Sequence, residues 1–422
     1  SRRAIRQGDK MISSSDKPEV REAKSVLRSG WAATGQLGKW VKRAGYVVKE
    51  LASDAPEAAR REWNYYREHH TSAILALTWA CTSRCKTCTI WCRNRRQDEE
   101  LTIDEWLEVG DTLAGQGIGT VELFGGDVFL RPELTVKLSA LLKARGCKVA
   151  IPTNSHLLTR EMAGELARSV HVFYLSTDGL DDLHDKVRGI SGAFGKVLRA
   201  IDYLKEARGS SKLPRLVCNT TVSRYNCRTL AKIAEFAKRR GFDEIHFEYV
   251  GEFTDEHVCT SRIGAYRPSP LYMRNGDSAL LTSELVPVMR EQLKQARPCH
   301  DKPSESGRRF KVRTSSTDVL SDVNLVRGTV PRRRCFFERM TTVIDPYGNI
   351  APCLFFDTYS VGNVRNGDLL RAVKTAYRMR FRRLRDSGQL ELCRHCIMSV
   401  VRNRTGRDVL RRAILDGRRL LV

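Results

Sequence analysis

The sequence predicts an α/β protein built on a parallel sheet, with a smaller cysteine-bearing region after it. Two observations support this prediction. Short β-rich runs alternate with helical patterns over residues 71–297, which is typical of repeated βα units. A second group of cysteines then encloses the pattern of a β-hairpin. The βα alternation alone does not distinguish an open doubly wound sheet from a partial barrel.

Residues 1–70 precede the βα units and are expected to form a basic, helical extension. Apolar residues recur at three- and four-residue steps from Leu37 to Leu51, with lysines and arginines between them, which predicts an amphipathic helix. Such a helix packs on its own domain or docks on a membrane surface or a partner. Trp31 and Trp40 favour the membrane interface, where amphipathic rings are enriched.

The βα region contains six candidate strands, expected at residues 73–79, 120–124, 148–153, 171–176, 215–222 and 244–250. Helices are expected at residues 103–114, 133–145, 160–169, 194–206, 230–240 and 281–295. Ligands of parallel α/β sheets bind at the carboxyl ends of the strands, and Cys81, Gly125 and Ser176 fall at such ends.

The remaining chain divides into three parts. Residues 298–334 are polar and strongly basic, and we expect an irregular linker or substrate loop there. Residues 335–400 are expected to form a small α+β domain whose hairpin turns at residues 346–349. A basic C-terminal helix is expected over residues 401–422.

Three cysteines, Cys81, Cys85 and Cys88, follow the first predicted strand in a C-x3-C-x2-C array. Thiolates are soft ligands suited to iron, and a short loop can direct all three at one iron-sulfur cubane. A cubane held by only three protein thiolates keeps one iron open to a substrate or cofactor. The alternative is an ordinary zinc or redox site with Cys92 as its fourth ligand.

This array, in its position after a first strand, resembles the signature of the radical S-adenosylmethionine (SAM) superfamily. Residues 125–127, Gly-Gly-Asp, resemble the family's Gly-Gly-Glu motif, with an acid one methylene shorter. Residues 176–179 and 184–189 resemble its Ser-x-Asp-Gly and His-Asp-x-x-Arg-Gly motifs. Thr87 stands where many members have an aromatic residue. The resemblance implies a (β/α)6 partial barrel over residues 71–297.

The resemblance also implies which residues contact SAM. Glycines permit close approach of the backbone to the SAM ammonium group, and carboxylates accept charge-assisted hydrogen bonds. Arg188 either clamps the SAM carboxylate or orders its loop. The expected cofactor-binding residues are Gly125, Gly126, Asp127, Asn154, Ser176, Asp178, Arg188 and Asn226. The sequence identifies no catalytic residue.

The later cysteines, Cys335, Cys353, Cys393 and Cys396, resemble those of the auxiliary-cluster domain called SPASM or of its shortened form, twitch. Four thiolates suffice for one fully ligated 4Fe-4S cluster. Since no cysteine follows Cys396, a twitch-like domain with one cluster is the better fit. A zinc knuckle with the same ligands is the alternative.

The formal net charge of +24, from 73 basic and 49 acidic residues, predicts an anionic partner such as an acidic membrane surface, an acidic peptide or RNA. From Arg371 onward, fifteen basic residues stand against four acids. No apolar run approaches a membrane span, and residues 1–10 show no signal-peptide core. We therefore expect a cytoplasmic location, with a peripheral place at a membrane left open. Thirteen cysteines then indicate metal sites and free thiols rather than disulfides.

The function implied by the resemblance is reductive cleavage of SAM to a 5'-deoxyadenosyl radical that abstracts hydrogen from an unactivated carbon. Oxidation, epimerisation or bond formation on a peptide, lipid or sugar-like substrate would follow. The implied cofactors are a three-cysteine 4Fe-4S cluster, one auxiliary 4Fe-4S cluster and SAM, with a reductant such as flavodoxin or ferredoxin as partner. The alternative is a non-catalytic iron-sulfur protein that binds nucleic acid as a redox sensor, which would have no need of the motifs at residues 125–127 and 176–178.

Overall fold

The computed structural model describes residues 56, 58–93, 95–300, 302–304, 307–331, 335–370 and 375–401. The amphipathic helix predicted within residues 1–55 and the C-terminal helix predicted after residue 401 lie outside these residues. The chain divides into two compact units, residues 1–62 with 404–422 and residues 63–403, and the second is described here. None of the helices in this part of the chain combines the length and the apolar character that crossing a membrane requires.

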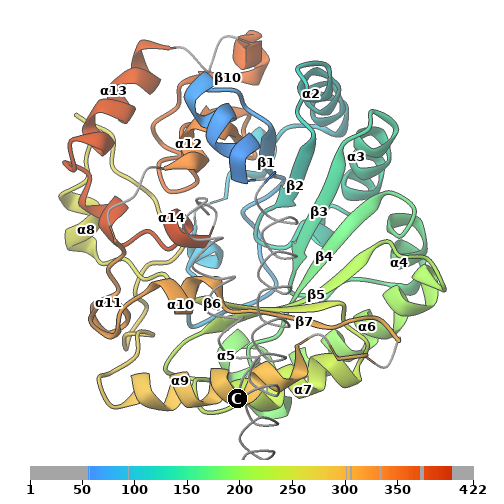
Figure 1. The fold of residues 1–422 in the computed structure, drawn as a ribbon. Coiled ribbons are helices and arrows are strands. Elements are labelled where there is room, and N and C mark those ends of the chain that lie inside the picture. The colour runs from blue at the N-terminus through green and yellow to red at the C-terminus, as the bar shows by residue number, and fades with distance from the viewer. Residues whose placement is uncertain are drawn as a thin grey trace, which may run out of the picture. The chain divides into compact units, whose positions relative to one another are not determined.

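One ten-stranded sheet organises the fold, in the order β10-β9-β8-β1-β2-β3-β4-β5-β6-β7 (Figure 1). Its strands are β1 (Ser72–Ala76), β2 (Thr120–Phe124), β3 (Lys148–Thr153), β4 (Val170–Ser176), β5 (Arg215–Val222), β6 (Glu244–Tyr249), β7 (Lys311–Arg313), β8 (Thr341–Ile344), β9 (Asn349–Ala351) and β10 (Gly362–Asn363). Neighbouring strands from β8 through β1 to β7 are parallel, and β9 is antiparallel to both of its neighbours, β8 and β10. Because β10 and β7 are opposite ends of this order, the sheet is not closed, and the predicted partial barrel is confirmed.

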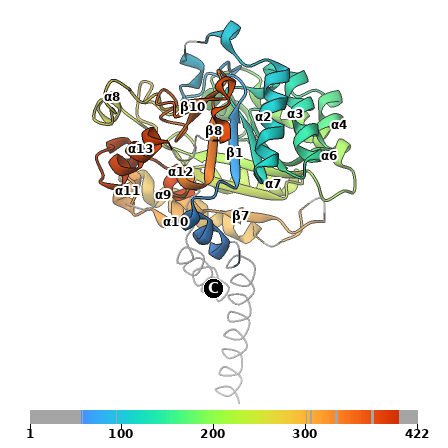
Figure 2. The ribbon, with the colours of Figure 1, turned by 90° about the horizontal axis from the view of Figure 1, so that it is seen from above.

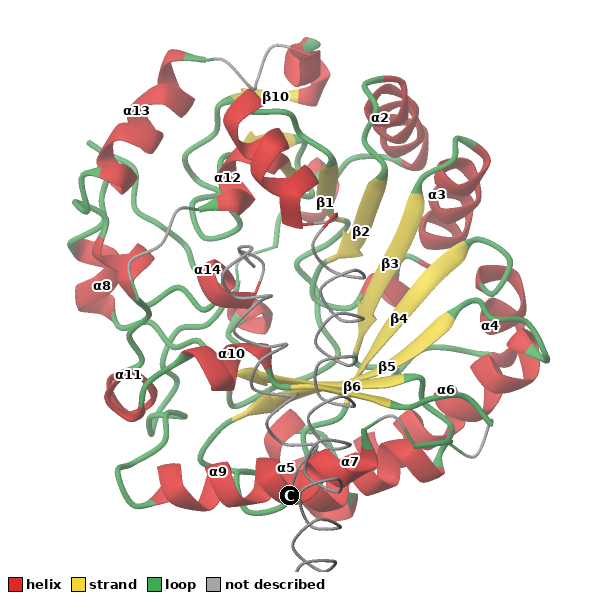
Figure 3. Cartoon of the chain, viewed as in Figure 1, coloured by secondary structure: helices red, strands yellow, loops and turns green. Residues whose placement is uncertain are grey.

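Helices connect the parallel strands and cover one face of the sheet (Figure 3). The helices of the barrel are α2 (Ile103–Gly115), α3 (Pro132–Ala144), α4 (Arg160–Leu166), α5 (Asp181–Arg188), α6 (Ala193–Arg208), α7 (Leu230–Arg239), α8 (Asp255–Cys259) and α9 (Leu285–Ala296). Later in the chain come α10 (Ser315–Val319), α11 (Asp322–Arg327), α12 (Phe336–Met340), α13 (Ala376–Asp386) and α14 (Met398–Val401).

Buried apolar residues alternate with more polar residues along the strands, so the sheet has an apolar face and a more polar face. Leu123, Ile151 and Phe173 are fully buried in the core that the strands share with the helices, and Ile151 pairs in register with Phe173. Their neighbours on the other face, such as Tyr174 and His246, are only half-buried. Since successive side chains of a strand point to opposite faces, the helices cover an apolar core and leave a polar concave face on the other side.

The segment predicted to be an irregular linker, residues 298–334, contains regular structure, which corrects that prediction. It contributes β7 at the sheet edge and the short helices α10 and α11. β7 is Lys-Val-Arg, and only Val312 is buried. A three-residue edge strand with one apolar residue is too short to show a period in the sequence.

The C-terminal cysteine region shares its sheet with the barrel. Its first strand, β8, pairs in parallel with β1, so that Ser72 faces Thr341 and Leu75 faces Ile344; Figure 2 shows the two strands side by side. The predicted hairpin turn lies between β8 and β9. There the buried Asp345 carboxylate accepts hydrogen bonds from the backbone N–H groups of Tyr347 (2.9 Å) and Asn349 (2.8 Å).

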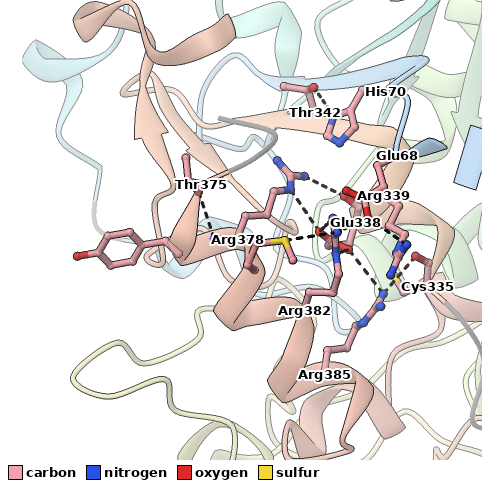
Figure 4. A network of polar contacts seen from close by, with 12 residues as sticks. Glu68, His70, Cys335, Glu338, Arg339, Thr342, Thr375, Arg378, Arg382 and Arg385 are labelled. Carbon is pink, nitrogen blue, oxygen red and sulfur yellow. Dashed lines mark hydrogen bonds and ion pairs between the residues drawn. The ribbon is translucent and has the colours of Figure 1, made fainter. Parts of the chain in front are cut away.

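The basic helix α13, part of the basic run that begins at Arg371, directs three of its arginines inward. Arg378, Arg382 and Arg385 are 0%, 4% and 9% exposed, at a spacing of four and three residues along one helix face. They surround the buried Glu338 of α12 (Figure 4). Arg382 donates to both Glu338 carboxylate oxygens, at 3.0 and 3.1 Å, and its other nitrogen lies 2.5 Å from Glu68.

We predict that Arg382→Ala destabilises the protein by about 3–5 kcal/mol, because it leaves the buried Glu338 with less of its compensating charge. The matched control is Arg383→Ala, the exposed neighbour on the same helix. It should change the free energy of unfolding by less than about 0.5 kcal/mol. Anaerobic guanidinium unfolding measures both values, and equal destabilisation would contradict the inward role of Arg382.

Candidate functional site

The loop after β1 brings Cys81, Cys85 and Cys88 together, as the sequence predicts. Cys85 is buried, and the other two are half-buried. Backbone N–H groups of Arg84 and Lys86 donate to the carbonyls of Arg188 (2.9 Å) and Val187 (3.0 Å), which fastens the loop to the end of α5. Cys92, by contrast, is exposed on a short 3-10 helix, Ile90–Cys92.

The electrostatics of these thiols fit a bound cationic cluster core. Burial, together with the neighbouring thiols, raises the pKa of Cys81 to about 11 and that of Cys88 to about 12. Three thiols packed this closely become ligands only as thiolates, and bound metal stabilises that form. This donor set therefore suits iron.

Gly125 and Gly126 allow the end of β2 to approach the chain that leads into the cysteine loop. Backbone N–H groups of Gly126 and Asp127 donate to the carbonyls of Thr78 (2.9 Å) and Ala80 (2.8 Å). A Cβ atom on Gly126 would lie 2.0 Å from the Ala80 oxygen, and Gly125 has φ +155°. No other residue type fits this approach, so the glycine motif shapes the entry to the loop.

Two residues predicted to contact SAM, Asp127 and Asn154, hold the cysteine loop in place. Thr82, within that loop, donates to the Asp127 carboxylate at 2.6 Å. The Asn154 amide donates to the hydroxyls of Thr82 (2.9 Å) and Ser83 (3.0 Å). Both Asp127 and Asn154 are buried. The two loop hydroxyls were missed at the sequence level because Thr and Ser between cysteines have no distinctive pattern.

Arg188 lies between a buried carboxylate and a cluster cysteine. Its Nη2 is 2.7 Å from Asp178 Oδ2, and its Nη1 lies 3.7 Å from Cys85 Sγ. Asp178 also accepts from the Thr221 N–H of β5 at 2.8 Å. Of the two roles expected for Arg188, the contacts are those of a residue that orders the loop.

Asn226 is fully buried, and its contacts lie inside the protein rather than in an open site. Its amide donates to the carbonyls of Asp178 and Thr221, both at 2.9 Å, and accepts from the Ser223 N–H at 2.9 Å. Asp178 is 1% exposed. These hydrogen bonds join the end of β4 to β5, and the expectation that Asp178 and Asn226 touch SAM stays a prediction.

Several buried polar atoms near these strand ends have no hydrogen-bond partner within the described protein. They include Ser155 Oγ and His156 Nε2, after β3, and Asn219 Oδ1 of β5. Asn219 pairs in register with Ser176, the half-buried residue expected to bind SAM. Unpartnered buried polar atoms are costly unless a ligand binds them, so this edge of the sheet suits a polar ligand such as SAM.

The row that contains Ser176 and Asn219 continues across the concave face to His246 of β6. His246 Nε2 lies 2.9 Å from Glu244, and its ring centroid is 5.7 Å from that of Tyr174. This face was not among the features predicted from the sequence. A period-2 pattern of polar residues in β4 and β6 is the signal that could have indicated it.

The second cysteine set comes together around α12 and the hairpin. Cys335 precedes α12, Cys353 follows β9, and Cys393 and Cys396 lie in and after a 3-10 helix, Glu391–Arg394. Burial raises the pKa of Cys353 well above its usual value, and the thiols of Cys396 and Cys335 raise it further. The four thiols therefore share one buried region.

Within the described ranges, no three His, Cys, Asp or Glu side chains converge on a single metal ion. A cubane distributes its thiolates over different irons and does not require such convergence. Among the remaining cysteines, Cys147, Cys218 and Cys227 are buried, Cys299 is half-buried and Cys259 is exposed.

Comparison with protein families gives two matches. Residues 76–223 match the radical SAM superfamily, and residues 335–397 match SPASM, an iron-sulfur cluster-binding domain. The two matched segments contain the first and second cysteine sets, respectively, so the donor chemistry and the family matches agree.

Similar proteins include the AdoMet-dependent heme synthase of Methanosarcina barkeri, 30% identical over 197 residues, or 44% of this chain and 55% of that protein. The PqqA peptide cyclase of Bradyrhizobium diazoefficiens is 31% identical over 169 residues, 39% of this chain and 43% of that protein. The match thus spans about half the length of these relatives. The crystal structure of Streptococcus suis SuiB bound to S-adenosylmethionine has a similar fold, with a TM-score of 0.55 at 14% identity, over 80% of this chain and 76% of that one.

We predict that Gly126→Ala loosens the cysteine loop, because the added Cβ collides with the Ala80 carbonyl. Overpacking of this kind costs about 1–3 kcal/mol of stability, and iron content should fall with it. The matched control is Gly164→Ala in α4, where a Cβ meets nothing within 4 Å. It should add about 0.5–1 kcal/mol of stability. Unfolding midpoints and iron per chain test the pair, and full iron content in Gly126→Ala would contradict the prediction.

Proposed function

Because this chain is a radical SAM protein with a C-terminal SPASM domain, we propose that it reductively cleaves SAM and abstracts a hydrogen atom from an unactivated substrate carbon. The observation that carries the proposal is the gathering of Cys81, Cys85 and Cys88 beside Arg188 at the carboxyl ends of the strands. Residues 71–297 would hold the SAM-binding cluster and residues 335–400 the auxiliary cluster. The proposed electron donor is a reductant such as flavodoxin or ferredoxin.

When bound, the three-thiolate cluster supplies the electron that cleaves SAM. The protein's part is to hold and enclose these groups. The Asp127 and Asn154 side chains fix the loop through its hydroxyls, and Arg188 places a buried positive charge beside Cys85. We propose that SAM contacts the backbone of Gly125 and Gly126, the Ser176 hydroxyl, and the unpartnered atoms of Ser155, His156 and Asn219.

For the substrate we propose a peptide. One relative is a PqqA peptide cyclase and another a heme synthase, so both a peptide and a tetrapyrrole deserve comparison. The concave face beside Ser176 carries polar groups, including His246, Glu248 and Arg313. Such a face offers partners to backbone amides, whereas a flat tetrapyrrole is bound mainly by apolar contacts.

We predict that Cys85→Ala abolishes formation of 5'-deoxyadenosine from SAM and dithionite, because the open cluster loses a thiolate. Cys92→Ala is the matched control, since Cys92 lies in the same segment but is exposed. It should retain wild-type formation. Iron should fall from roughly eight to roughly four per chain in Cys85→Ala, because the auxiliary cluster stays. Continued product formation in Cys85→Ala would refute the proposed reaction.

The choice of a peptide is tested by titration with heme, followed by its visible absorbance. We expect no one-to-one complex that depends on His246, because the polar groups of the concave face, including Glu248 and Arg313, do not match the apolar surface of a tetrapyrrole. His246→Ala separates specific binding from adventitious binding to surface thiols. A one-to-one complex in the wild type that disappears in His246→Ala would contradict the peptide proposal and favour a tetrapyrrole.

A further inference from the structure

The network around Glu338 places more positive than negative charge next to the second cysteine set. Three buried guanidinium groups, those of Arg378, Arg382 and Arg385, surround one buried carboxylate. Glu68 and Asp386 also pair with members of the network, but they are 27% and 51% exposed. Water screens exposed charges far more than buried ones, so positive charge predominates in the interior here.

Arg385 is the member of this network that reaches the cysteines. Its Nη1 donates to the Cys335 carbonyl at 3.2 Å and lies 3.9 Å from Glu338 Oε2 (Figure 4). The guanidinium therefore lies directly against the residue that supplies one of the four thiols.

A buried positive charge affects a cluster differently in its two oxidation states. One-electron reduction adds one negative charge to the cluster and its four thiolates. A nearby buried cation stabilises the reduced form more than the oxidised form, and net charge near a cluster is among the factors that set its reduction potential.

We propose that Arg385, held by Glu338, raises the reduction potential of the auxiliary cluster and so fits that cluster to accept an electron. Arg385 is a positioning residue in this proposal, since it acts through the cluster and not on the substrate. The inference rests on the proposed assignment of Cys335, Cys353, Cys393 and Cys396 as ligands. Of the two uses open to an auxiliary cluster, electron acceptance and structural or relay support, it favours the first.

The experiment uses the full chain with Cys81, Cys85 and Cys88 all replaced by alanine, so that only the auxiliary cluster titrates. Reduction by dithionite with redox mediators is followed by EPR and visible absorbance. We expect Arg385→Gln to lower the one-electron reduction equilibrium constant at least tenfold, which corresponds to 59 mV. Arg385→Lys keeps the charge and should stay close to the parent.

Two further variants make the test specific. Arg394→Gln is the matched control, because Arg394 adjoins Cys393 in sequence, but its side chain is 68% exposed and pairs with Glu391. It should leave the potential unchanged. Asp386→Asn removes a half-exposed negative charge paired with Arg385, leaves the guanidinium in place and should raise the potential. If Arg385→Gln fails to load its cluster, Asp386→Asn still tests whether the charge around Arg385 affects the reduction potential.

The outcomes separate the inference from the function on which it rests. A parent protein that holds no cluster after anaerobic reconstitution would overturn the ligand assignment and the inference together. A loaded cluster whose potential is the same in the parent and Arg385→Gln would overturn the inference alone. So would a potential that falls in Asp386→Asn, or one that falls as far in Arg394→Gln as in Arg385→Gln.

Discussion

The ion pair between Arg188 and Asp178 is the interaction on which the first site depends. Asp178 follows β4 and also accepts from the β5 backbone, while Arg188 ends α5 and reaches Cys85. A buried guanidinium is tolerated only where a carboxylate compensates it. The pair therefore fixes the cysteine loop to two strands at once, so the position of the cysteines follows the sheet rather than the loop's own flexibility.

The second site repeats this arrangement with different residues. Arg385 donates to the Cys335 backbone carbonyl, whereas Arg188 contacts the Cys85 sulfur. Glu338 compensates the charge of Arg385, as Asp178 compensates that of Arg188. Each cysteine set thus has an arginine beside it, half-buried Arg188 or buried Arg385, and a buried acid paired with that arginine. The two sites differ in the ratio of positive to negative charge, because Glu338 is shared among three arginines. The two sets of thiols consequently lie in different electrostatic surroundings.

Pairing of β8 with β1 joins the two sites mechanically. The cysteine loop begins just after β1, and the hairpin that leads to Cys353 begins with β8, so adjacent strands carry both sites. Sheet hydrogen bonds between neighbouring strands hold their relative position closely. The two family matches end at residue 223 and begin at residue 335, but the sheet is continuous across both matched segments.

The sequence by itself determined the six barrel strands, the two cysteine sets and the hairpin turn, because these depend on local periodicity and spacing. It did not determine which way a polar residue points. Asp127, Asp178 and Asn226 occupy the expected strand ends, yet they bind the protein's own backbone and loop. The arginines of α13 form a basic run in the chain, yet three of them lie inside around Glu338. Only the tertiary structure decided these points, because the partners of these side chains lie 40 to 48 positions away in the chain.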